Sequence, residues 1–190
     1  MATACTQYFL AGMGQECLGS ASGLKRLAIA PARDFELVPD DNTSAHTATF
    51  SATSTASTFY EYYISDEAAS ITSTLNVNNQ NGVRYYLNTV TATLVRMRPE
   101  KHMELIALAN ERLVVLVQDA NGQWWGYDNA KCTSQTAQSG LAADDLSGYQ
   151  LEIQGRNPVL AYGITNSPAI DTHPVYEQKK RIIIIKKKKY

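Results

Sequence analysis

Two glycine spacings near the start of the chain come close to motifs that carry chemistry. Gly14 and Gly19 have the spacing of a phosphate-binding P-loop, but Ser20-Ala21 stands where that loop needs Lys followed by Ser or Thr. Gly19 and Gly23 also have the spacing of a nucleophile elbow, in which Ala21 occupies the position of the serine. Neither spacing therefore predicts nucleotide binding or catalysis.

The acidic and histidine residues do not form a catalytic or metal-binding pattern either. Asp40-Asp41 lies in a Pro-Asp-Asp-Asn run and Asp144-Asp145 precedes a Ser-Gly turn. Both pairs are typical of solvated turns rather than of calcium ligands or general acids. His46, His102 and His173 are not at metal-ligand spacing. We expect no catalytic residues, no metal, no cofactor and no enzymatic activity.

The three cysteines and the N-terminus bear on the cellular compartment. Cys5, Cys17 and Cys132 form no C-x-x-C pair, and their odd number suggests a reducing compartment or buried free thiols, with structural thiols favoured over a metal site. The N-terminus lacks the basic and apolar regions of a secretory signal. No apolar run approaches the roughly 18 residues of a transmembrane helix, so we expect no membrane span.

Charge is divided unevenly along the chain. The whole chain has 17 Lys and Arg against 18 Asp and Glu, a net charge of −1. Residues 176–190 hold seven of the basic residues and one acidic residue, so this tail is near +6 and the remaining body, with 10 basic and 17 acidic residues, is near −7. An acidic body is poorly suited to holding the phosphates of nucleic acid.

A continuous stretch in the middle of the chain predicts strand, helix and hairpin in that order. Residues 84–95 alternate with a period of two and are rich in Thr, Val and Tyr, which predicts a strand too long for an ordinary small core. Pro99 suits the first position of a helix that ends near Asn110. Residues 113–117 form a short apolar strand, and Asn121-Gly122 turns the chain into a partner strand at 123–127.

The spacing of apolar residues predicts which face the helix buries. Met103, Ile106, Ala107 and Asn110 share one face, which Leu105, Leu108 and Ala109 widen. We expect Ile106 to lie in the core, so that Ile106→Asp would unfold the domain.

Further strands are expected on both sides of this stretch. Alternation and turn residues place them at 24–30, 35–38, 59–64, 69–77 and 149–154. The residues therefore predict a mainly β protein with one helix, long hairpins and extended ends. We expect a flexible N-terminal arm at 1–23, one β domain at 24–157, and an extended C-terminal arm at 158–190.

A Ser/Thr run and an aromatic run are the candidate assembly surfaces. Residues 43–58 read either as a linker or solvated hairpin, or as a polar loop that orders only against a neighbouring subunit. On the second reading Thr49, Ser51 and Thr53 would lie at the interface. Residues 59–64 carry aromatics on both faces, which suggests contact with both core and partner, through Tyr60 and Tyr62, or a carbohydrate-stacking platform.

The C-terminal tail has four isoleucines between basic residues, Ile182, Ile183, Ile184 and Ile185. This β-branched run could add a strand to the open sheet edge of a neighbour, while the flanking lysines limit aggregation. Rival readings are a membrane-surface or nucleic-acid anchor, or a segment produced by codon drift alone.

The order of elements resembles tail-tube-like and neck-ring virion proteins of tailed bacteriophages, especially phages that infect Bacteroidetes. The resemblance covers roughly residues 1–157. It is carried by Asn76–Arg98, Pro99–Asn110, Arg112–Tyr127 with Asn121-Gly122 and Trp124-Trp125, Asp145–Gly155, and Gly23-Leu24-Lys25 preceded by Cys17.

This resemblance implies two packed antiparallel sheets, a sandwich or barrel, flanked by one α-helix. It implies a structural virion protein, made in the host cytoplasm, that assembles into a ring, typically of six copies. The ring or tube would contact other neck or tail proteins and form a conduit that DNA passes without specific binding. The basic, Ile-rich tail departs from a simple tube and leaves a neck or tail-completion role open.

An alternative reading is a carbohydrate- or receptor-binding β-sandwich module of the virion. It would use Trp124, Trp125 and the aromatics of 59–64. Adjacent residues of a strand point to opposite faces, so the two tryptophans cannot serve one platform.

Overall fold

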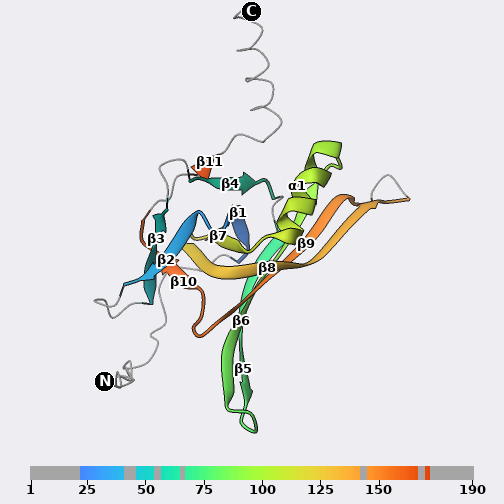
Figure 1. Ribbon diagram of the computed structural model, residues 1–190. Helices are drawn as coiled ribbons and strands as arrows, with labels where there is room; N and C mark the ends of the chain where they lie inside the picture. The colour runs from blue at the N-terminus through green and yellow to red at the C-terminus, as the bar shows by residue number, and fades with distance from the viewer. Residues whose placement is uncertain are drawn as a thin grey trace, which may run out of the picture.

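The computed structural model describes residues 22–40, 46–53, 57–64, 67–141, 145–166 and 170–171. This part of the chain is mainly β, with one helix (Figure 1). Its elements are β1 Leu24–Pro31, β2 Phe35–Pro39, β3 Thr47–Ala52, β4 Phe59–Tyr62, β5 Ala69–Asn78, β6 Val83–Val95, α1 Pro99–Asn110, β7 Leu113–Asp119, β8 Trp124–Ser139, β9 Ser147–Asn157, β10 Tyr162–Ile164 and β11 Ile170–Asp171.

Strands β1 and β7 form the centre of the fold and separate two hydrophobic cores. They pair in antiparallel register from Leu24↔Asp119 to Pro31↔Leu113. Successive side chains of a strand point to opposite faces, so strands that are apolar throughout can fill a core on each side. The larger core contains Leu27, Ile29, Val115 and Val117, and the smaller core contains Ala28, Ala30, Val114 and Leu116.

The smaller core is closed by phenylalanines from opposite ends of the sheet. Along the main path the strands are ordered β11-β4-β1-β7-β8-β10-β3-β2. Phe59 of β4 nevertheless contacts Phe35 of β2 and Phe50 of β3, with ring centroids 4.2 and 5.4 Å apart. The sheet therefore curls until its two ends meet around the smaller core.

The sheet divides at β8. The first part of β8 pairs with β7 on one edge and with β10 on the other, whereas Ala130–Ser139 pair with β9. One extra residue of β8 is accommodated between Tyr127 and Ala130, where Asn129 has φ +53°. A bulge of this kind bends a strand, which lets one strand serve both branches. One branch continues to β3 and β2, the other through β9 to β6 and β5.

The sheet is mixed, because β10 pairs with β3 and β11 with β4 in parallel. These two short strands follow Asn157, where the sequence predicted the domain to end and an arm to begin. Ala161 and Ile164 are buried, at 7% and 5% exposure. The folded body therefore continues at least to Ile164, because these residues complete the two cores.

The helix occupies the predicted residues but presents a different face to the core. Leu105 and Leu108 are buried, whereas Met103 and Ile106 are 71% and 56% exposed. The prediction that Ile106 lies in the core is wrong. Tyr149 holds the residue before the helix, because its hydroxyl accepts from the Arg98 N–H at 3.0 Å and donates to the Arg98 carbonyl at 3.1 Å, and Leu105 and Leu108 then pack in the larger core.

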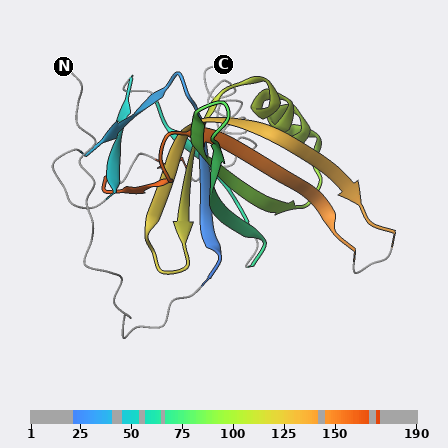
Figure 2. The same cartoon turned by 90° about the horizontal axis from the view of Figure 1, so that it is seen from below.

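Two hairpins extend from the body in different directions (Figures 1 and 2). The β5–β6 hairpin pairs continuously from Ala69↔Ala92 to Asn78↔Val83, but β9 accompanies β6 only as far as Tyr86↔Asn157. The β8–β9 hairpin pairs out to Ser139↔Ser147. Both arms therefore run beyond the residues that pack in the cores.

Candidate functional site

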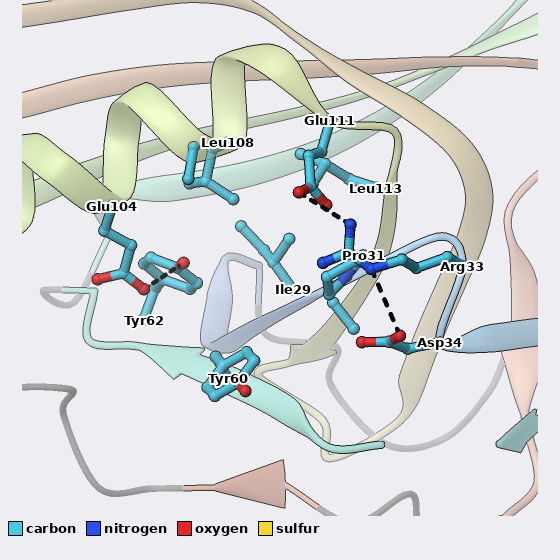
Figure 3. Close-up of a pocket in the computed structure, with 12 residues that line it drawn as sticks. Ile29, Pro31, Arg33, Asp34, Tyr60, Tyr62, Glu104, Leu108, Glu111 and Leu113 are labelled. Carbon is cyan, nitrogen blue, oxygen red and sulfur yellow. Dashed lines mark hydrogen bonds and ion pairs between the residues drawn. The ribbon is translucent and has the colours of Figure 1, made fainter. Parts of the chain in front are cut away.

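Of the residues predicted to form an assembly interface, Tyr60 and Tyr62 lie together in a pocket beneath α1 (Figure 3). The pocket has a volume of about 340 Å³. It is lined by Ile29, Ala30, Pro31, Arg33, Asp34, Tyr60, Tyr62, Glu104, Ala107, Leu108, Glu111 and Leu113. These residues come from β1 and its turn to β2, from β4, from α1 and from the start of β7.

Strand register and helix periodicity explain why these side chains converge. Tyr60 pairs with Ile29 across the β1–β4 ladder, so both side chains lie on the same face of the sheet. On the helix, Glu104 and Leu108 are four residues apart and so lie along one side, and Glu111 is the residue just after the helix. The helix thus faces the tyrosines of β4 across the pocket.

Apolar side chains form the floor of the pocket and charged groups form its rim. Ile29, Leu108 and Leu113 lie in the middle of the view in Figure 3, between the tyrosines and the Arg33 group. Arg33 Nη1 lies 3.0 Å from Glu111 Oε1, and Arg33 Nε lies 3.7 Å from Asp34 Oδ1. Adding Glu104 leaves three carboxylates against one guanidinium in the lining.

Glu104 accepts a hydrogen bond from a tyrosine and, more weakly, attracts the charge of Lys101. The Tyr62 hydroxyl donates to Glu104 Oε1 at 2.6 Å. Burial raises the pKa of Tyr62 well above its usual value, and the neighbouring Glu104 carboxylate raises this pKa further because both would be negative. Within the described residues Glu104 forms no ion pair. Its charge is thus available to a cationic group that enters the pocket.

Thr53, another predicted interface residue, braces the rim of the pocket. Its hydroxyl donates to the carbonyl of Arg33 at 3.0 Å, and its N–H donates to the carbonyl of Asp34 at 3.0 Å. These bonds hold the turn that carries both charged residues. Thr53 is therefore engaged within its own chain.

Within the Ser/Thr run, residues 47–52 form a strand of the same chain. β3 pairs with β2 from Phe35↔Ala52 to Pro39↔Ala48 and with β10, and it buries Ala48 and Phe50 in the smaller core. The expectation that the run orders only against a neighbouring subunit is wrong for these residues. Thr49 and Ser51 alternate with the buried pair and so lie on the outer face of β3, away from the smaller core.

Ile182, Ile183, Ile184 and Ile185, the other predicted interface residues, lie outside the described part of the chain.

The two tryptophans point to opposite faces, as the sequence predicted. Trp124 packs against the smaller core with the Arg26 guanidinium 5.3 Å from its ring. Trp125 packs against the larger core and donates from Nε1 to Asp119 Oδ2 at 2.9 Å. Each ring is already engaged within the body, so the pair forms no common stacking surface.

Sequence reasoning missed a second surface, on the β5–β6 hairpin. Leu75 and Val77 are 43% and 54% exposed. They share a face with Ile71, which packs against the larger core. The alternation of Ile71, Leu75 and Val77 in the sequence indicates an apolar face of the strand. It does not indicate which of these residues lie beyond the core. Glu104 and Leu108, four residues apart on the predicted helix, gave a second signal that sequence reasoning did not use.

The lining of the pocket combines apolar, aromatic and carboxylate side chains. It contains no histidine, cysteine or serine. In the described residues no three His, Cys, Asp or Glu side chains are grouped so that they could hold a metal ion. The arrangement of apolar floor, tyrosine rings and carboxylates can hold a group that is both apolar and cationic.

No helix in the described residues is long and apolar enough to cross a membrane. The chain matches no protein-family model, and comparisons with curated proteins and with solved structures found no similar chain or fold.

Proposed function

We propose that this protein is a structural subunit of a phage virion, from the tail or neck, that assembles with copies of itself into a ring or tube through which DNA passes. The observation that carries the proposal is the exposed apolar face of the β5–β6 hairpin. An apolar face that resumes beyond the core, outside the polar Ser73↔Asn88 pair, is suited to be covered by another copy.

The register of the hairpin defines this face. On one face, Ala69 and Ile71 pair with Ala92 and Val90, within or against the larger core. Further out on the same face, Leu75 pairs with Tyr86, and Val77 follows at the tip. We call Leu75, Val77 and Tyr86 the hairpin face. Covering it would remove apolar area from water at roughly 25 cal/mol per Å².

The outer edge of the hairpin supports the same proposal. β5 is ten residues long and, among the described strands, pairs only with β6. Such an edge exposes unpaired backbone N–H and C=O groups, which are a template for a strand of another molecule. A ring formed by joining edges would satisfy these groups around a closed circle.

The arrangement of layers and the charge of the body fit a conduit. We propose that the β1–β7 layer and the β5–β6–β9 layer form the two layers of a sandwich, with the larger core between them. The body of the chain is near −7, so an assembled wall would repel DNA phosphates and allow the duplex to move.

The proposal is tested by placing charges on the hairpin face. Leu75→Lys combined with Val77→Lys should abolish higher oligomers in analytical ultracentrifugation, because each lysine would have to be desolvated in the interface. The matched control is Thr72→Lys with Thr74→Lys, which puts the same charges on the opposite face of the same strand. Equal assembly of the hairpin-face variant and the wild type would refute the role of this face.

A further inference from the structure

The last described strand brings the chain to the edge of the pocket. β11 pairs with β4 through Ile170↔Phe59 and Asp171↔Tyr60, and the Tyr60 side chain lines the pocket. The residues after Asp171 therefore begin beside the pocket. They include residues 179–189, KKRIIIIKKKK, which we call the tail segment.

The pocket and the tail segment are complementary in two respects. The pocket offers an apolar floor with Ile29, Leu108 and Leu113, and the tail segment offers four consecutive isoleucines. The pocket lining has an excess of two negative charges, and the tail segment carries seven basic residues. We propose that the tail segment of the same chain docks in this pocket, with isoleucine side chains on the floor and flanking lysines at the carboxylates.

The length of the connecting chain permits this docking. Eleven residue steps separate Asp171 from Ile182, and an extended chain covers at most about 3.3–3.6 Å per residue, or roughly 36–40 Å. That length is ample for the chain to reverse direction beside Tyr60 and return beneath α1. A segment tethered so closely has an effective concentration on the order of millimolar, which favours its own pocket over that of a neighbour.

We expect a lysine of the tail segment to form an ion pair with Glu104. Its carboxylate accepts from Tyr62 and forms no ion pair within the described residues, whereas Glu111 is already paired with Arg33. A lysine at Glu104 would be screened by salt only in part, because Tyr62 beside it is partly buried against the larger core. Docking should therefore weaken at high ionic strength without being lost, since the isoleucines remain covered.

The test is disulfide trapping in the full-length chain. Cys5→Ser, Cys17→Ser and Cys132→Ser remove the native thiols, and Ala107→Cys on the pocket wall is combined with Ile184→Cys in the tail segment. Dilute protein is oxidised mildly, and free thiols and mass are measured. We expect an intramolecular disulfide that forms at least tenfold faster than in the matched control, in which Thr74→Cys on the hairpin replaces Ala107→Cys.

Two results would overturn the proposal. Equal rates for the two cysteine pairs would show that the tail segment does not favour the pocket. A covalent dimer as the main product would assign the tail segment to a neighbouring copy, as the strand-donor interpretation of the sequence predicts. The trapping experiment measures a contact within one chain, whereas the hairpin variants measure assembly between chains. A negative result for tail docking is therefore distinguishable from a negative result for assembly.

A second measurement keeps the native cysteines. Trypsin should cleave the tail segment of the full-length protein severalfold faster in Glu104→Lys than in the wild type, because the docked lysines lose their partner. Glu100→Lys, an exposed change in the first turn of the same helix, is the matched control and should cleave at the wild-type rate. Equal cleavage in Glu104→Lys and wild type would contradict docking at Glu104.

Discussion

Asn157 of β9 links β6 to β8 through side-chain hydrogen bonds. It accepts from Asn88 Nδ2 of β6 at 3.3 Å and donates to Asp128 Oδ1 of β8 at 2.6 Å. Asn88 is fully buried, and its Oδ1 has no hydrogen-bond partner among the described residues. A buried amide with one unpaired oxygen lowers the free energy of unfolding. Loss of a further hydrogen bond to the Asn88 side chain should therefore destabilise the fold more than loss of an exposed bond.

We predict that Asn157→Ala destabilises the fold by about 2–3 kcal/mol, because it leaves the Asn88 amide and the Asp128 carboxylate without their shared partner. Urea unfolding followed by circular dichroism measures this change. Asn110→Ala, at the exposed end of α1, removes a bond to Ile106 O and is the control, with an expected change within about 0.5 kcal/mol. Equal effects of the two variants would mean that the hydrogen bonds of Asn157 do not stabilise the contact of β6 and β9 with β8.

Tyr62 makes the free energy of unfolding depend on pH in the alkaline range. Its pKa is raised in the folded protein by burial and by Glu104, so the folded state holds the phenolic proton more tightly than the unfolded chain. This contribution is complete below the ordinary tyrosine pKa of about 10 and is lost as pH rises from there through the folded pKa. The unfolding free energy should therefore fall above about pH 10.

The variant Tyr62→Phe should show a smaller fall over the same pH range, because it removes this titrating group. At neutral pH it should already be less stable by about 1 kcal/mol, since the bond to Glu104 is lost. Unfolding midpoints at about pH 8 and about pH 11 give both numbers. Tyr127, whose pKa burial also raises, is present in both proteins and cancels in the comparison. Parallel pH curves for wild type and variant would contradict the assignment.

At the scale of elements, local pattern predicted the helix and most strands but not the way they dock. The apolar run of β7 and the Asn-Gly hairpin follow from short-range chemistry. In the turn only Gly122 adopts a positive φ, of +92°, while the Asp119 carboxylate accepts from the N–H groups of Asn121 and Gln123 at 2.9 Å. The residues of β7 and of the turn were thus sufficient to predict the hairpin.

The strands that sequence reasoning missed are those that depend on distant partners. The second part of β8 is polar, and its pairing with β9 makes it a strand. β3 lies in a Ser/Thr run whose Ala48 and Phe50 gain a core only when β2 and β10 are in place. The pocket could not be predicted for the same reason, because it joins α1 to β4 across a sequence distance that no local pattern encodes.

The helix provides a direct comparison of buried and exposed positions. Leu108→Ala should cost about 2–5 kcal/mol, because it opens a cavity in the larger core. Ile106→Ala, two residues away on the same helix, should change stability by about 0.5 kcal/mol or less, since Ile106 is 56% exposed. Thermal or urea unfolding of both variants measures the two losses of stability. A larger loss for Ile106→Ala would restore the face that the sequence predicted.

At the scale of the whole molecule, we propose that shape and charge serve contact with other copies of the chain. Two hairpins extend beyond the cores, one with an apolar face, and the acidic body is separated in sequence from a strongly basic tail. The proposed docking of the tail segment beneath α1 would place its positive charge against pocket carboxylates. The proposed assembly instead uses the hairpin face and the edge of β5, so the two contacts do not compete.

The most direct measurement of this account is negative-stain electron microscopy of the purified full-length protein over a range of concentrations, with mass measured in parallel. The account predicts closed rings or stacked tubes with a central hole, whose rotational symmetry gives the number of copies. A particle that remains monomeric at every concentration would contradict the central claim that the chain assembles itself into a conduit.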